Sequence, residues 1–248
     1  MNARPEAVEN FRQNLKAVED LITFDRQVLD FLSASLTSLK TRLKKYEIDN
    51  PYLQPDKLIT MVEQLRERQA LSRYYEAMYN QCLVLTVSHF ASGVRELFVE
   101  GIAAAAARGS EQIADEVLKV KVEHLLDETV DRHILVAETI ADSSDNSWQD
   151  MQSIGRAFAK YFGESPERDD ITNNIIVAQA VRHVIVHTGA MVDRRLLSQI
   201  KKANPREFNP SLVIDQPIQL TPEDVRLCGR SMLTYLERLA YIVHKAAI

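Results

Sequence analysis

No proline occurs between Pro55 and Pro166, and this feature limits the possible folds more than any other. The interval is rich in Ala, Leu, Glu, Gln and Arg. These residues form helices well, whereas a proline inside a helix costs ~3 kcal/mol. Strand-like alternation appears in SLVIDQPIQL, between Pro210 and Pro222, with too little neighbouring β-sequence to build a sheet. The sequence therefore predicts an all-α chain, with no linker that separates two domains.

An apolar heptad seam runs through the first fifty residues. Such a seam is typical of a long packed or coiled-coil helix. It predicts one helix of about forty residues that ends at Asn50-Pro51, or a helical hairpin if the chain breaks near Asp25. We assign residues 1–50 to this helix, with a role in packing or dimerisation, and residues 51–248 to a helical domain. The seam alternates steps of three and four, and only Asp25 is polar among Val8, Phe11, Leu15, Val18, Ile22, Asp25, Leu29, Leu32, Leu36, Leu39, Leu43 and Tyr46.

Caps and helix breakers divide the rest of the chain. Ser110 and Asn146 are candidate N-caps, Gly163 is a candidate helix end, and Thr221-Pro222 combines an N-cap with a first-turn proline. Residues 111–150 carry 11 acids and 3 bases, which is typical of a solvated helix face; a surface for a basic partner is the alternative. These signals predict helices over about 55–107, 110–140, 147–162, 171–187, 191–202 and from 222 onward.

The composition excludes several classes of protein. Only 7 Gly occur and none of them forms a phosphate-binding loop, while the two Cys provide neither a disulfide framework nor a multi-Cys zinc site. The first residues lack the apolar core of a signal peptide. The longest uncharged run, Ala77 to Val94, contains polar residues and reads as a buried helix, so we expect no membrane span. We therefore expect a cytoplasmic protein.

One segment contains residues that can carry chemistry: AVRHVIVHTG, residues 180–189. Arg182, His183 and His187 lie there at the end of an otherwise apolar helix, so they need polar partners or a cleft. The two imidazoles, four residues apart, share a helix face. Arg182 and His187 differ by ~140° around the axis, so they converge only if Arg182 curls round or the helix meets a second copy. A purely structural role is the alternative.

The HxxxH spacing of His183 and His187 also suggests a metal site as an alternative. Catalytic zinc normally takes three protein ligands, and no Glu lies within HVIVH to act as a base. The nearest acid, Asp193, follows Gly189. We therefore predict no metal ligand here.

The string from Arg182 to Gly189 resembles the Rx4–6H signature of the HEPN superfamily (higher eukaryotes and prokaryotes nucleotide-binding domain). In that family the residue after Arg is typically polar, as His183 is, and a small polar residue and Gly often follow the final His, as Thr188 and Gly189 do. The resemblance covers about residues 75–246 and omits the heptad helix. It implies a metal-independent, cofactor-free endoribonuclease, or an RNA-binding relative without catalysis. It also implies a homodimer with both motifs in one cleft and a toxin–antitoxin or other defence role, where an antitoxin or defence protein is a partner.

The charge distribution agrees with an RNA partner. The chain has a net charge of −5, which excludes a uniformly basic surface, yet residues 171–210 hold six bases and two acids. A solvated basic helix face is the alternative. The resemblance assigns catalysis to Arg182, His187 and His183. The competing functions are a non-catalytic RNA- or nucleotide-binding module of the same fold and a helical protein-interaction subunit. The bases after the motif that we expect to bind RNA are Arg194, Arg195, Lys201 and Lys202.

Overall fold

The structure is a computed structural model that describes residues 5–48, 54–67, 72–121, 123–124, 127 and 129–246, without the side chains of residues 25, 65–67 and 72–73. It is all-α: the described residues contain helices and two isolated β-bridges but no strand. Its long helices are α1 (Glu6–Lys45), α3 (Ser72–Ala107) and α10 (Pro222–Ala246). Around them lie α2 (Pro55–Glu67), α4 (Glu111–Ala114), α6 (Arg132–Ala141), α7 (Met151–Phe162), α8 (Asp170–His187) and α9 (Arg194–Lys201).

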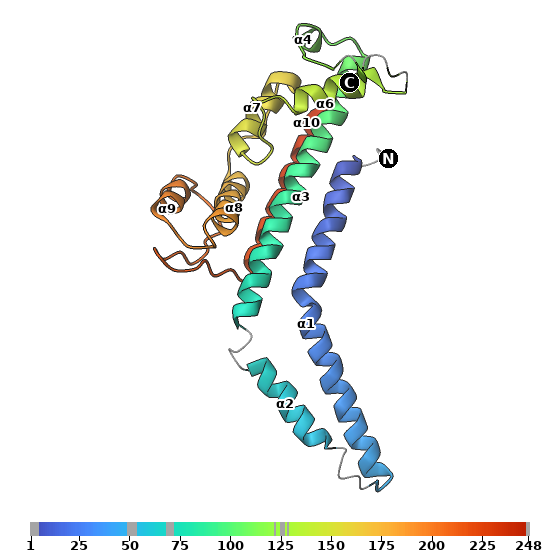
Figure 1. The fold of residues 1–248 in the computed structure, drawn as a ribbon, viewed down its shortest axis with the longest axis vertical. Coiled ribbons are helices and arrows are strands. Elements are labelled where there is room, and N and C mark those ends of the chain that lie inside the picture. The colour runs from blue at the N-terminus through green and yellow to red at the C-terminus, as the bar shows by residue number, and fades with distance from the viewer. Residues whose placement is uncertain are drawn as a thin grey trace.

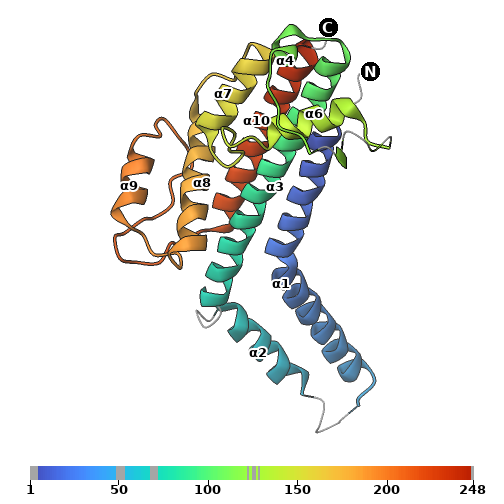
Figure 2. The ribbon, with the colours of Figure 1, turned by 45° about the horizontal axis from the view of Figure 1, so that its top comes forward.

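The helix α3 is the centre of the bundle. It contacts α1, α6, α8 and α10, while α8 and α9 lie on the side away from α1 (Figures 1 and 2). By length and composition α3 could cross a membrane over Tyr74–Ala107, but 56% of its most apolar window is buried inside the protein. That burial is expected of a central helix.

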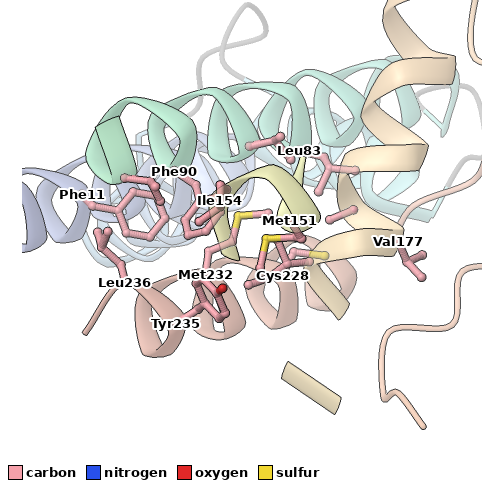
Figure 3. Packing of buried hydrophobic residues seen from close by; sticks show 14 of the residues in the cluster. Phe11, Leu83, Phe90, Met151, Ile154, Val177, Cys228, Met232, Tyr235 and Leu236 are labelled. Atoms are coloured by element: carbon pink, nitrogen blue, oxygen red, sulfur yellow. The ribbon is translucent and has the colours of Figure 1, made fainter. Parts of the chain in front are cut away.

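Aromatic side chains connect the three long helices. Phe90 of α3 lies edge-on to Phe11 of α1 and to Tyr235 of α10, with ring centroids 6.1 Å apart in both pairs (Figure 3). All three rings are buried. The first half of the heptad seam therefore packs into the same core as α3 and α10.

The helix α1 continues through residue 25 without the break that would make a hairpin. At ~1.5 Å per residue it is about 60 Å long, and its second half extends past the start of α3, where α2 lies beside it (Figure 1). Here the seam is only partly covered, and Tyr46 is 65% exposed. A second apolar stripe at heptad spacing is also exposed: Leu21, Phe24, Val28 and Phe31. The helix ends at Lys45, before the predicted stop at Asn50-Pro51; that stop, and with it the division at residue 50, lies outside the described residues.

The predicted acidic helix over 110–140 is wrong. The helix α4 ends at Ala114, residues 115–121 are not helical, and α6 begins at Arg132. The segment after Ala114 alternates apolar and charged residues and lacks the three-and-four spacing of a helix. Asp131 then starts a new helix, because its carboxylate accepts hydrogen bonds from the backbone N–H groups of His133 and Ile134.

The predicted cap at Asn146 is also wrong. The N-cap of α7 is Asp150, whose carboxylate accepts a hydrogen bond from the backbone N–H of Ser153 at 2.9 Å. Asn146 instead donates from Nδ2 to the backbone oxygen of Ile140 at 2.8 Å. It thus closes the end of α6, since an Asn side chain satisfies orphan carbonyls as readily as orphan N–H groups.

The other boundaries agree better with the sequence. The helix α7 ends at Gly163, which has φ +75°, and α10 begins at Pro222 behind a reciprocal pair of hydrogen bonds between Thr221 and Asp224. The region 55–107 contains α2 and α3, and residues 68–71 lie outside the description. The predicted helix from residue 191 begins later, at Arg194, because Met191 forms an isolated bridge with Pro217.

Candidate functional site

The helix α8, which carries the motif, is fixed at its start by Asp169. One carboxylate oxygen accepts a hydrogen bond from the backbone N–H of Thr172 at 2.9 Å, which caps the helix. The other accepts one from Arg238 of α10 at 2.6 Å. Apolar side chains then bury α8 against α3 and α10: Ile175, Val177, Ala178, Val181, Val184 and Ile185.

Two buried asparagines attach the chain after α9 to α8. Asn173 donates from Nδ2 to the backbone oxygen of Pro205 at 2.8 Å. The Oδ1 of Asn174 accepts from the backbone N–H of Phe208 at 2.8 Å, and its Nδ2 donates to Ser231 of α10 at 3.1 Å. Because buried polar groups cost free energy unless they are paired, these bonds fix α8 and the chain after α9 in one arrangement.

The turn after His187 leaves the motif at a helix end. The hydroxyl of Thr188 donates to the backbone oxygen of Val184 at 2.9 Å, and Gly189 follows with φ +65°. A glycine adopts this left-handed conformation without the clash that a Cβ brings. Residues 182–187 therefore occupy the last turns of α8, beside α9.

The structure brings the two imidazoles of the motif together and directs Arg182 elsewhere. The rings of His183 and His187 are exposed, and their centroids lie 4.6 Å apart. Arg182 is half-buried and donates from Nη1 to Oε1 of Gln149 at 3.2 Å. Its Nε is buried without a hydrogen-bond partner. Arg182 therefore bonds to an amide rather than to an acid.

Neighbouring charges act on His183. Neighbouring protein atoms remove some of the water around this exposed ring, which lowers its pKa below the ordinary value of 6.5, and the charges of His187, Arg195 and Arg182 lower it further. Asp193 opposes this effect. Since cations nearby disfavour a protonated imidazole, the neutral ring that can accept a proton is favoured at neutral pH.

The helix α9 presents the predicted RNA-binding cations to solvent. Asp193 caps it by accepting a hydrogen bond from the backbone N–H of Leu196 at 2.7 Å, and Leu196 and Ile200 are buried. Elsewhere many cations are paired, as Arg226 is with Glu19 at 2.7 Å. Within the described part of the chain, no carboxylate forms an ion pair with the four exposed cations Arg194, Arg195, Lys201 and Lys202.

Only some of these residues share a cavity. A cavity of about 350 Å³ lies between the start of α7, α8 and α9, and His183, Arg195 and Lys202 line it. Arg194 and Lys201 do not. Arg168, from the loop before α8, also lines it and was not predicted from the sequence. Its loop sequence, GESPERDD, gives no signal beyond a polar turn.

Arg206, one of the six bases within residues 171–210, has a structural role. Its guanidinium donates to the backbone oxygens of Ile200, Ala203 and Phe208 at 3.0, 2.6 and 3.0 Å. The bonds to Ile200 and Ala203 satisfy carbonyls at the end of α9, and the bond to Phe208 holds the chain that follows. Its charge adds to the local field, while its donors hold the chain after α9.

The described residues contain no group of three or more His, Cys, Asp or Glu that could hold a metal ion. Searches of protein-family models, curated proteins and solved structures find no match to this chain. The resemblance to the HEPN superfamily therefore rests on the motif and on its place at the end of a helix in an all-α protein.

Proposed function

We propose that this protein is a metal-independent endoribonuclease of the HEPN type, acting in the cytoplasm as part of a toxin or defence system. The observation that carries the proposal is the paired imidazoles of His183 and His187 at the end of α8, beside cations of α9 that have no carboxylate partner among the described residues. Paired imidazoles supply proton transfer, and unpaired cations attract the phosphates of RNA.

The chemistry needs no cofactor, because RNA provides its own nucleophile. One imidazole removes the proton of a ribose 2′-OH, and the oxygen attacks the adjacent phosphorus. The bond from phosphorus to the 5′-oxygen breaks, and that oxygen takes a proton from an imidazolium. The products are a 2′,3′-cyclic phosphate and a 5′-hydroxyl. His187 acts as base or acid, and His183 shares the proton transfer or orients the site.

Arg182 stabilises the charge that develops on the phosphate oxygens. Within one chain its guanidinium bonds to Gln149, and no hydrogen bond among the described residues joins it to His187. We infer a homodimer in which a two-fold axis near the end of α8 would bring Arg182 of one copy to His187 of the other.

This arrangement in a dimer has a direct test. Arg182→Ala and His187→Ala proteins are each inactive, but mixing them with subunit exchange restores one intact site in each mixed dimer. About a quarter of the wild-type activity is then expected, because half the dimers are mixed and each has one good site of two. No recovery after verified exchange would contradict a site shared between copies.

The activity itself is tested with single-stranded RNA in EDTA. Arg182→Ala and His187→Ala should each reduce the cleavage rate ~10²–10⁴-fold. The chain offers a matched control pair, Arg132→Ala and His133→Ala, at exposed positions on α6. Cleavage that survives both motif substitutions would remove the site, and activity lost in EDTA and restored by zinc would favour a metal enzyme.

A second candidate function, a helical interaction subunit, is favoured by the apolar surface of α1. Phe24 is 59% and Phe31 is 72% exposed, on a part of the helix beyond the core. Large exposed apolar patches mark surfaces that bind other proteins. The Phe24→Ser/Phe31→Ser double variant should leave RNA cleavage unchanged if the ribonuclease proposal holds. A protein that neither binds nor cleaves RNA, and whose self-association this variant abolishes, would support the interaction role instead.

A further inference from the structure

The cavity beside the motif has an unusual lining. It lies where the start of α7 faces α8 and α9, and its volume of about 350 Å³ falls within the ~300–1,000 Å³ range of small-molecule sites. His183 lines it, so it adjoins the two imidazoles. Four glutamines also line it, from three separate segments of the chain: Gln149, Gln152, Gln179 and Gln199.

The charge of the lining favours an anion. Arg168, Arg195 and Lys202 contribute cations, and Asp150 is the carboxylate. Asp150 already caps α7 through the backbone N–H of Ser153. Arg168 is held in place, since it donates to Oδ1 of Asn173 and to the backbone oxygen of Lys202, both at 2.8 Å. A fixed guanidinium beside two exposed cations suits a phosphate group.

The glutamines add a second kind of recognition. The Nε2 of Gln179 is buried and has no hydrogen-bond partner, and an unmet buried donor costs ~1–3 kcal/mol. Because Gln179 lines the cavity, a turn of its carboxamide toward an acceptor on a bound ligand would remove this cost. Each carboxamide offers both donors and an acceptor, the combination that pairs with the edge of a nucleobase.

We propose that this cavity binds one nucleotide of the RNA, next to the cleaved phosphate. Arg195 and Lys202 hold its phosphate, while Gln179 and Gln199 bond to the base. The inference rests on the proposed function, because that proposal identifies the bound chain as RNA. The binding of a nucleotide is argued from the lining residues alone. Binding of the base in this cavity makes the cleavage selective for one base. A base with a different pattern of hydrogen-bond donors and acceptors would leave the buried amide of Gln179 unpaired.

The test uses the full-length wild-type protein, because mononucleotides contain no phosphodiester bond for it to cleave. The four nucleoside 3′-monophosphates and inorganic phosphate are titrated by calorimetry. One nucleotide should bind at least about tenfold more tightly than the others and than phosphate, as expected from one to two additional hydrogen bonds. Equal affinity for all five ligands, or no binding, would overturn the proposal.

Side-chain variants locate the site. Gln179→Met, and separately Gln199→Met, should remove most of the discrimination between bases, while Lys202→Ala should weaken all four nucleotides alike. Gln13→Met and Lys16→Ala, at exposed positions of α1, are matched controls that leave binding unchanged. Unaltered discrimination in both glutamine variants would contradict the proposal.

The failure of this inference can be told from the failure of the ribonuclease. If Gln179→Met abolishes selective nucleotide binding but the wild-type protein cleaves no RNA, the cavity assignment stands and the enzyme assignment falls. If the wild-type protein cleaves RNA without base preference and Gln179→Met cleaves identically, the enzyme assignment stands and the cavity assignment falls.

Discussion

Replacing Asn174 by leucine should destabilise the protein and loosen the site. The buried carboxamide, 2% exposed, accepts hydrogen bonds from the backbone N–H groups of Glu207 and Phe208 at 3.0 and 2.8 Å and donates to Ser231 at 3.1 Å. A leucine has the same branching and the same number of side-chain heavy atoms but no polar atom, so two backbone donors lose their acceptor. Each unmet buried donor costs ~1–3 kcal/mol, and the part-buried N–H of Glu207 costs less than the buried N–H of Phe208. The free energy of unfolding should therefore fall by about 2–4 kcal/mol.

Urea denaturation followed by far-UV circular dichroism measures this loss. Ser231→Ala is the control, because it leaves both backbone donors satisfied and only the Nδ2 of Asn174 without an acceptor; at ~1–3 kcal/mol for that one donor it should cost less than Asn174→Leu. A cost within ~0.5 kcal/mol for Asn174→Leu, the range of ordinary surface substitutions, would refute the view that this amide joins α8 to the chain after α9.

Three further predictions follow from local geometry. Gly101→Ala should destabilise by ~1–3 kcal/mol in thermal unfolding, because its Cβ would lie 2.7 Å from the ring of Phe162; a neutral result would contradict the close packing there. Gly155→Ala, on α7, should stabilise by ~0.5–1 kcal/mol in the same measurement, because outside the adjacent backbone of its own helix no atom lies within 4 Å of the new Cβ. An NMR titration should place the pKa of His183 below 6.5, since burial and then neighbouring cations lower it, and Arg195→Ala should raise it; an unchanged value would contradict this coupling.

The helical architecture could be predicted because its signals are local. The capping pair of Thr221 and Asp224, the left-handed Gly163 and the three-and-four spacing of the α1 seam all act within a few residues of the chain. The same reasoning failed at Asn146, where two residues with equal capping ability compete. Trp148 helps decide the outcome, because its Nε1 donates to the backbone oxygen of Ala141 at 3.1 Å and holds residues 146–150 against the end of α6.

The candidate site was predicted only in part. The placement of His183 beside His187 follows from helical geometry, whereas the N-cap Asp193 was missed, because the helix was predicted to start at Met191. The contact of Arg182 with Gln149 joins residues 33 positions apart, and no local pattern predicts such a contact. The glutamine-lined cavity is likewise assembled from separate segments, each unremarkable as sequence.

The central claim is that the end of α8 cleaves RNA through the ribose 2′-OH. It is tested most directly with an end-labelled oligoribonucleotide in EDTA, compared with one that carries a single 2′-deoxynucleotide at the mapped cleavage position. The account predicts a 2′,3′-cyclic phosphate on the first product, no cleavage at the deoxy position, and no product from the His187→Ala protein. Cleavage at the deoxy position, or equal product from His187→Ala, would contradict it.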